Sequence, residues 1–152
     1  MTTTVLQNRV AFVIIVGHFV ALFSLIGFWL LGGFAFQEFT TALAITMPLF
    51  ANNVTLVVNY YLDNQIQEHD DKLVSRLTSF IATIFPSGLI AMLVFAFALK
   101  AFNLGISNFE GFKGFIAIIE TTFGVYAAII AKKLFVTPTN GAMTKSPQQT
   151  TS

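Results

Sequence analysis

Two ionisable side chains interrupt the apolar stretches of this sequence, and they are its clearest candidates for chemistry. Glu120 lies in the apolar run from Phe112 to Phe135, and His18 lies in the run from Val10 to Leu31. A carboxyl group in such surroundings can coordinate an ion, exchange a proton or gate a path, and an imidazole can relay a proton. The alternative for each is a structural role, in which a neutral side chain is hydrogen-bonded to polar neighbours.

A row of amides and hydroxyls marks one side of the apolar run from Phe39 to Leu62. At about 100° per residue these side chains share one sector of a helix whose other side is apolar. The members of this polar stripe are Thr41, Asn52, Thr55 and Asn59. Asn53 stands apart, on an intermediate face with Thr46. The polar stripe either joins neighbouring helices through hydrogen bonds, each of about 0.6–2 kcal/mol, or lines a pore or a hydrated cavity.

Two prolines interrupt the same kind of apolar run. Pro48 lies within the polar stripe, and Pro86 lies in the run from Leu77 to Leu99. Each proline frees a backbone carbonyl within a helix, so we expect a kink at both positions. Because a hydrated cavity or a polar neighbour can satisfy the freed carbonyl, Pro48 favours the pore interpretation of the stripe.

Small residues indicate where these helices pack. In the last apolar run they share one helical face with Glu120, and they are Ala117, Thr121, Gly124, Ala127, Ala128 and Ala131. Comparable small faces occur in the first and third runs, and their members are Gly17, Ala21, Ser24, Ser79, Thr83, Ser87 and Ala91. Small side chains let helix backbones approach closely, so we expect these faces to contact protein.

Four apolar runs must position all of these residues: Val10 to Leu31, Phe39 to Leu62, Leu77 to Leu99 and Phe112 to Phe135. Each run holds the roughly 20 residues that a helix needs to cross about 30 Å of hydrocarbon. The whole chain is 55% hydrophobic and 10% charged, against about 25% charged residues in an ordinary soluble domain. The sequence therefore predicts an all-α integral membrane protein, a bundle of four transmembrane helices.

Charge distribution predicts how this bundle is oriented. Residues 1–136 form the predicted transmembrane domain, and residues 137–152 form a polar C-terminal tail that we expect to be disordered. An even number of spans places both termini on one side. That side holds six basic residues, Arg9, Lys72, Arg76, Lys132, Lys133 and Lys145, against Lys100 and Lys113 on the other. This excess predicts a multi-pass protein of the cytoplasmic membrane with both termini in the cytoplasm.

The connection of residues 63–76 is acidic and would face the cytoplasm. Glu68, Asp70 and Asp71 are its candidates for docking a cytoplasmic protein partner. They lack the ligand spacing of a calcium loop, so we expect no metal there. The chain also lacks a phosphate-binding glycine loop, a nucleophile elbow and a zinc-binding histidine pair, so neither an enzyme nor a cofactor is indicated. A net charge of +1 argues against nucleic acid as a partner.

Three functional hypotheses fit this pattern. Because four helices make a bundle too thin to enclose a wide channel, we expect a homo-oligomer in the lipid bilayer, with any permeation path on its symmetry axis. The first hypothesis is an ion-conducting or gated pore, lined by the polar stripe, with Glu120 setting selectivity or gating. The second is a non-conducting membrane subunit that senses membrane perturbation, confers immunity to a pore-forming toxin or anchors a soluble effector, as in bacterial defence systems. The third is a small proton-coupled transporter that uses Glu120.

Overall fold

The computed structural model describes residues 2–64, 73–105 and 108–131, which fold into four long helices. The helices are α1 (Thr3–Leu30), α2 (Phe36–Asn64), α3 (Arg76–Ala101) and α4 (Phe109–Tyr126). A short π-helical segment, η1 (Ala127–Ala131), continues α4. The prediction of an all-helical chain is confirmed for the described residues, whose one extended pairing is an isolated bridge between Thr2 and Leu73.

All four helices are long and apolar enough to cross a membrane. Their candidate spans hold 28, 24, 26 and 21 residues, against the roughly 20 that a crossing requires. Each helix begins before its predicted apolar run, and the difference is largest for α1, which begins at Thr3 rather than at Val10. Side chains cap two of the helix starts: Ser75 accepts a hydrogen bond from the N–H of Thr78, and Asn108 accepts one from the N–H of Glu110.

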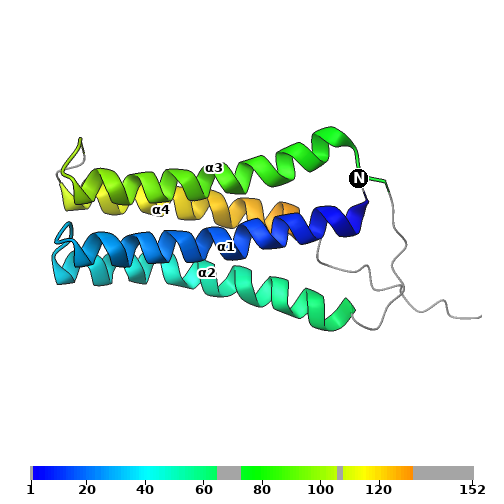
Figure 1. Ribbon diagram of the computed structural model, residues 1–152, viewed down its shortest axis with the longest axis horizontal. Coiled ribbons are helices and arrows are strands. Elements are labelled where there is room, and N and C mark those ends of the chain that lie inside the picture. Colours follow the sequence, from blue (N-terminus) through cyan, green and yellow to red (C-terminus); the bar gives the residue numbers. More distant parts are fainter. Residues whose placement is uncertain (1, 65–72, 106–107, 132–152) are drawn as a thin grey trace, which may run out of the picture.

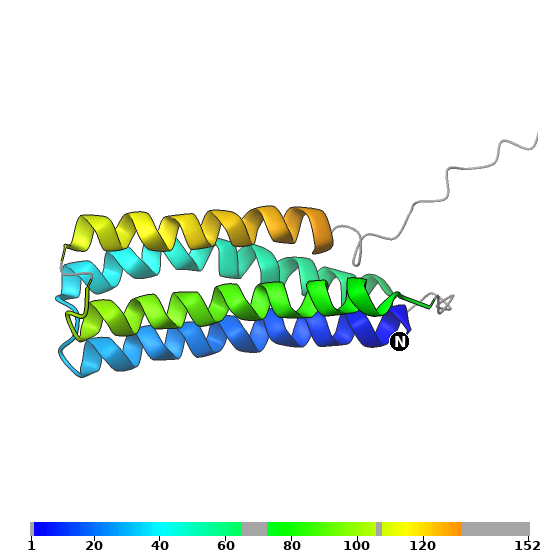
Figure 2. The same ribbon diagram turned by 90° about the horizontal axis from the view of Figure 1, so that it is seen from above.

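The helices run alternately in opposite directions and lie side by side in one bundle (Figure 1). Helix α1 packs against α2 and most extensively against α3, while α4 packs against α2 and α3. The α1–α2 and α3–α4 turns lie at one end, here called the turn end, and the N-terminus lies at the opposite, N-terminal end. Figure 2 shows that α1 and α3 form one face of the bundle and that α2 and α4 form the opposite face.

Large apolar side chains fill the interior of the bundle. Those with almost no exposed surface include Leu6, Val10, Ile14, Leu25, Phe97, Phe112 and Ile116. The outer surface is also apolar, and its exposed large side chains include Phe12, Phe23, Leu30, Phe95 and Ile118. A soluble monomer rarely exposes so much contiguous apolar surface. Together with the length and hydropathy of the helices, this surface suggests a multi-pass membrane protein.

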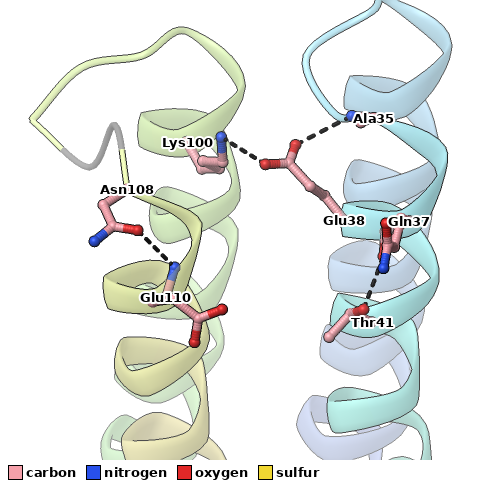
Figure 3. A network of polar contacts seen from close by, with 7 residues as sticks. All are labelled: Ala35, Gln37, Glu38, Thr41, Lys100, Asn108 and Glu110. Atoms are coloured by element: carbon pink, nitrogen blue, oxygen red, sulfur yellow. Dashed lines mark hydrogen bonds and ion pairs between the residues drawn. The ribbon is translucent and has the colours of Figure 1, made fainter.

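An ion pair joins the two helical hairpins at the turn end (Figure 3). Nζ of Lys100 on α3 lies 3.1 Å from Oε1 of Glu38 on α2, and the two side chains are only 9% and 23% exposed. The other carboxylate oxygen of Glu38 accepts a hydrogen bond of 3.1 Å from the backbone N–H of Ala35, at the start of α2. We call these three residues the Glu38 clamp. The sequence did not predict it, because its charged members belong to different hairpins.

Two glycines shape the α1–α2 turn beside this clamp. Gly32 has a φ of +80°, which residues with a side chain rarely adopt. A Cβ atom on Gly33 would lie 2.6 Å from the Cβ and 2.9 Å from the Cα of Ala101, at the end of α3. The glycines therefore allow the turn to lie directly against α3.

Candidate functional site: a lateral groove between α2 and α4

A groove runs along the outer surface between α2 and α4. The polar stripe of α2 contributes Pro48 and Asn52 to its lining. The small face of α4 contributes Ala117, Glu120, Thr121, Gly124 and Ala128. Helical periodicity predicted both faces separately, but it gave no information on whether they adjoin. The structure brings them together on the side of the bundle, and we call this feature the α2–α4 groove.

Glu120 is the most unusual residue of the α2–α4 groove. It is only 8% exposed, yet it lines the groove. Among the described residues, its buried Oε1 atom has no hydrogen-bond partner. An ionised carboxylate without a partner in such a place costs on the order of several kcal/mol. Glu120 therefore needs a hydrogen bond or a counter-charge that the described part of one chain does not supply.

The backbone of α4 comes close to α2 beside this carboxyl group. Gly124 lies one helical turn after Glu120, and a Cβ atom placed on it would lie 3.6 Å from Cδ1 of Leu49 on α2. That distance is an ordinary van der Waals contact. The small face of α4 thus serves as a packing surface against α2 at Gly124, and its remaining part is open to the outside at Ala117, Thr121 and Ala128.

The polar stripe of α2 faces outward rather than into the bundle. Asn52, Thr55 and Asn59 are exposed, and Thr41 is half-buried. The hydroxyl groups of Thr41 and Thr55 donate to the carbonyl groups of Gln37 and Ala51 in their own helix, at 2.8 Å each. Figure 3 includes the first of these bonds. Within residues 2–64, 73–105 and 108–131, no hydrogen bond joins the stripe to another helix of the chain.

The inward-facing amide of α2 is Asn53. It is 2% exposed, and its Nδ2 atom has no hydrogen-bond partner in the described part of the chain. The sequence placed Asn53 on an intermediate face, beside Thr46, which is also buried. The signal that would have found it is its spacing from Ala42, Thr46 and Val57, which recur at helical intervals and are all buried.

His18 is buried between aromatic rings. Its ring stacks on Phe50 at a centroid distance of 5.5 Å and meets the edge of Phe123 at 4.8 Å. Its Nδ1 atom donates a hydrogen bond of 2.7 Å to the carbonyl oxygen of Ile14, one turn earlier on α1. In the described residues no hydrogen bond connects His18 with Glu120. His18 does not line the α2–α4 groove.

The remaining candidate residues lie elsewhere in the bundle. Pro48 is exposed in the groove and Pro86 is buried, and both stand inside continuous helices. On α1, Ala21 is buried, and a Cβ atom on Gly17 would lie 2.2 Å from Cδ1 of Ile90, which reflects a close approach to α3. Ala127 is buried beyond the end of α4.

Several predictions fall outside the described residues. The docking candidates Glu68, Asp70 and Asp71 belong to residues 65–72, and the predicted tail of residues 137–152 also lies outside. Ala131 ends η1, and its side chain is likewise outside the description. Where side chains are described, no group of three or more histidine, aspartate or glutamate residues could hold a metal ion. The chain matches no family model, no curated protein and no solved structure.

Proposed function

We propose that this protein is a homo-oligomeric integral membrane protein that forms an ion-conducting or gated pore. The α2–α4 groove of each copy would face the symmetry axis of the assembly. The observation that carries this proposal is Glu120, whose buried Oε1 atom has no hydrogen-bond partner among the described residues and which lines an outward-facing groove together with Asn52. In a lone chain this groove would present an acid and an amide to lipid, which is costly.

The proposed orientation places both termini in the cytoplasm. Arg9 and Arg76 lie near the N-terminal end, and Lys100 and Lys113 lie near the turn end. The proposed topology assigns four further basic residues of the full sequence to the same side: Lys72, Lys132, Lys133 and Lys145. The positive-inside rule then assigns the N-terminal end to the cytoplasmic face. The turn end, with the Glu38 clamp, would face the opposite side of the cytoplasmic membrane.

Packing of the interior supports a path between chains rather than through one chain. The described core is occupied by fully buried side chains such as Ile14, Phe97 and Ile116. Polar groups that a permeating ion requires lie instead on the α2–α4 surface. Closed symmetry brings the same surface of every copy to one axis, so a polar groove repeated around that axis becomes a polar path.

The chemistry of the groove favours cations. Amide and hydroxyl oxygens from Asn52 and Thr121 can replace water around an ion, and a ring of Glu120 carboxylates would attract positive charge and repel anions. The same arrangement would let Glu120 of one copy meet polar groups of the next, which removes the cost of a partnerless acid. Glu120 would thus act in selectivity, in gating or in both.

The experiment is single-channel recording of the purified protein in planar bilayers. We expect discrete, cation-selective openings in the wild type, altered conductance in Asn52→Leu, and reduced cation selectivity in Glu120→Gln, with the oligomer intact in both variants. Two neighbouring threonines provide a matched control. Both hydroxyls donate to carbonyl groups of their own helix, at 2.7 and 2.8 Å, but only Thr121 lines the groove. Thr121→Val should change conductance, and Thr122→Val should not.

Other outcomes would favour the two remaining hypotheses. A folded oligomer that gives no openings would contradict the pore and favour a non-conducting membrane subunit. Proton flux without discrete openings, abolished by Glu120→Gln, would instead support a proton-coupled transporter. If Asn52→Leu and Thr121→Val only dissociate the oligomer, the groove would be a packing surface.

A further inference from the structure

Two arginines lie at the N-terminal end of the α1–α3 face. Arg9 on α1 and Arg76 at the start of α3 are both exposed, and both line one hollow between these helices. Among the described residues, no ion pair involves either guanidinium group. Unlike these arginines, both described lysines form ion pairs: Lys100 pairs with Glu38 at 3.1 Å, and Lys113 pairs with Glu110 at 2.7 Å. The hollow therefore carries two positive charges that the described chain does not neutralise.

Hydroxyl groups continue this hollow along α3. Ser79, Thr83 and Ser87 lie at successive turns of the helix and line it together with the arginines. The hydroxyls of Thr83 and Ser87 donate to carbonyl oxygens of α3 itself, at 3.0 and 2.8 Å. The hollow also lies at the positive, N-terminal end of α3. Guanidinium groups bind phosphate oxygens in a bidentate manner, so the chemistry at this end suits a phosphate group.

An apolar groove leads from this hollow toward the turn end. Ser87 lines both features, and Phe12 and Val13 line both the apolar groove and a second hollow that includes Arg9. Apart from Ser87, only apolar residues line the groove, with Val16 and Val20 on the α1 side. From Arg9 to Val20, α1 rises about 16 Å, which is close to half of the ~30 Å hydrocarbon thickness. The groove thus has the length of one leaflet.

We propose that the apolar groove and the hollow with the two arginines, together called the α1–α3 groove, bind an anionic phospholipid of the cytoplasmic leaflet. Its phosphate would lie between Arg9 and Arg76, and one acyl chain would lie along the apolar groove beside Val16. A free anion would bind only in the hollow with the two arginines, and an uncharged lipid would bind only in the apolar groove. A phospholipid with a net negative charge uses both parts, and such lipids are enriched in the cytoplasmic leaflet. The inference rests on the proposed membrane orientation and does not require conduction.

The test is lipid titration of the purified protein in detergent, followed by native mass spectrometry. The probes are phosphatidylglycerol and phosphatidylcholine with identical acyl chains, and inorganic phosphate as a competitor. We expect phosphatidylglycerol to bind more tightly than phosphatidylcholine. Arg9→Gln and Arg76→Gln should each weaken its binding about fivefold, as expected for the loss of one basic group at a membrane surface. Lys113→Gln, at the opposite end, is the matched charge control and should leave binding unchanged.

A second variant examines the apolar part of the site. Ala91 is exposed and lines the apolar groove, so Ala91→Phe should fill it and weaken phosphatidylglycerol binding while both arginines remain. Equal binding of the two lipids, or equal weakening by Lys113→Gln, would overturn the proposal. Displacement of phosphatidylglycerol by inorganic phosphate, with no effect of Ala91→Phe, would show a free-anion site and overturn it as well. If an arginine variant fails to fold, the wild-type lipid comparison and Ala91→Phe decide the question.

Discussion

At the scale of single residues, the half-buried carboxyl group of Glu38 and the buried carboxyl group of Glu120 stand in opposite situations. Glu38 has a lysine partner and a backbone N–H, whereas the Oε1 atom of Glu120 has no partner among the described residues. Removing one member of a satisfied buried pair leaves the other uncompensated, and removing a partnerless charge relieves a cost. The same substitution, glutamate to glutamine, should therefore change stability in opposite directions at the two positions.

The prediction for Glu120 concerns the isolated chain in dilute detergent. At mildly alkaline pH, at which an ordinary carboxyl group is ionised, we expect Glu120→Gln to raise the free energy of unfolding by about 1–2 kcal/mol. Thermal unfolding followed by circular dichroism measures the effect. Glu38→Gln is the comparison and should lower the free energy of unfolding by about 1–3 kcal/mol, because it leaves buried Lys100 without a counter-charge. Destabilisation by Glu120→Gln would mean that this carboxyl has a partner within the chain.

At the scale of helices, the close approach of α1 to α3 depends on the absence of a side chain at Gly17. A Cβ atom there would lie 2.2 Å from Cδ1 of Ile90 and 3.2 Å from Cγ1 of the same residue. The nearest atom is the end of a side chain, so the contact can be relieved locally. Gly33 is different, because its added Cβ would meet the backbone of Ala101 at 2.9 Å.

We predict that Gly17→Ala destabilises the protein by about 1 kcal/mol and that Ile90→Val restores most of this loss. Valine lacks the Cδ1 atom that causes the clash, so the two changes should be coupled in a double-mutant cycle measured by thermal unfolding. Gly88→Ala is the control. An added Cβ there meets nothing within 4 Å, and alanine should gain about 0.5–1 kcal/mol from its higher helix propensity. Additive effects at Gly17 and Ile90 would contradict the predicted contact.

The sequence predicted the helices well because length and hydropathy are properties of each segment alone. It did not predict which faces adjoin, because that depends on the rotation of each helix in the bundle. Asn52 and Asn53 illustrate the difficulty: they lie about 100° apart on α2, and one is exposed while the other is buried. Likewise, Thr121 and Asn52 line the same groove only because α4 packs beside α2. Predicting the Glu38 clamp would have required the same knowledge of how the helices pack.

At the scale of the whole molecule, the bundle has two unlike faces on opposite sides. The α2–α4 face carries Asn52, Glu120 and Thr121, and the α1–α3 face carries an apolar groove with basic residues at one end. Under the proposals made above, the first face meets other copies of the chain and the second meets lipid. This division makes a direct prediction about which positions of two copies come close together.

Single cysteines can report that proximity, because the natural chain contains none. We expect Thr121→Cys to form an intermolecular disulfide in oxidised membranes and Phe95→Cys, on the α1–α3 face, to form none. Both positions are exposed in the single chain. Non-reducing gel electrophoresis distinguishes the two variants. Cross-linking of Phe95→Cys but not of Thr121→Cys would place the wrong face at the axis.

The Glu38 clamp also has a mechanical consequence. The turn end is fixed by the Lys100–Glu38 ion pair and by the contact of Phe112 with Phe34 and Phe97, while α2 and α3 spread apart toward the N-terminal end (Figure 1). If the hairpins move relative to each other, we therefore expect them to tilt about the clamp. Over the roughly 42 Å of a 28-residue helix, a tilt of about 5° moves the far end by about 4 Å. A small rotation at the clamp would thus produce a displacement of several ångströms at the opposite end.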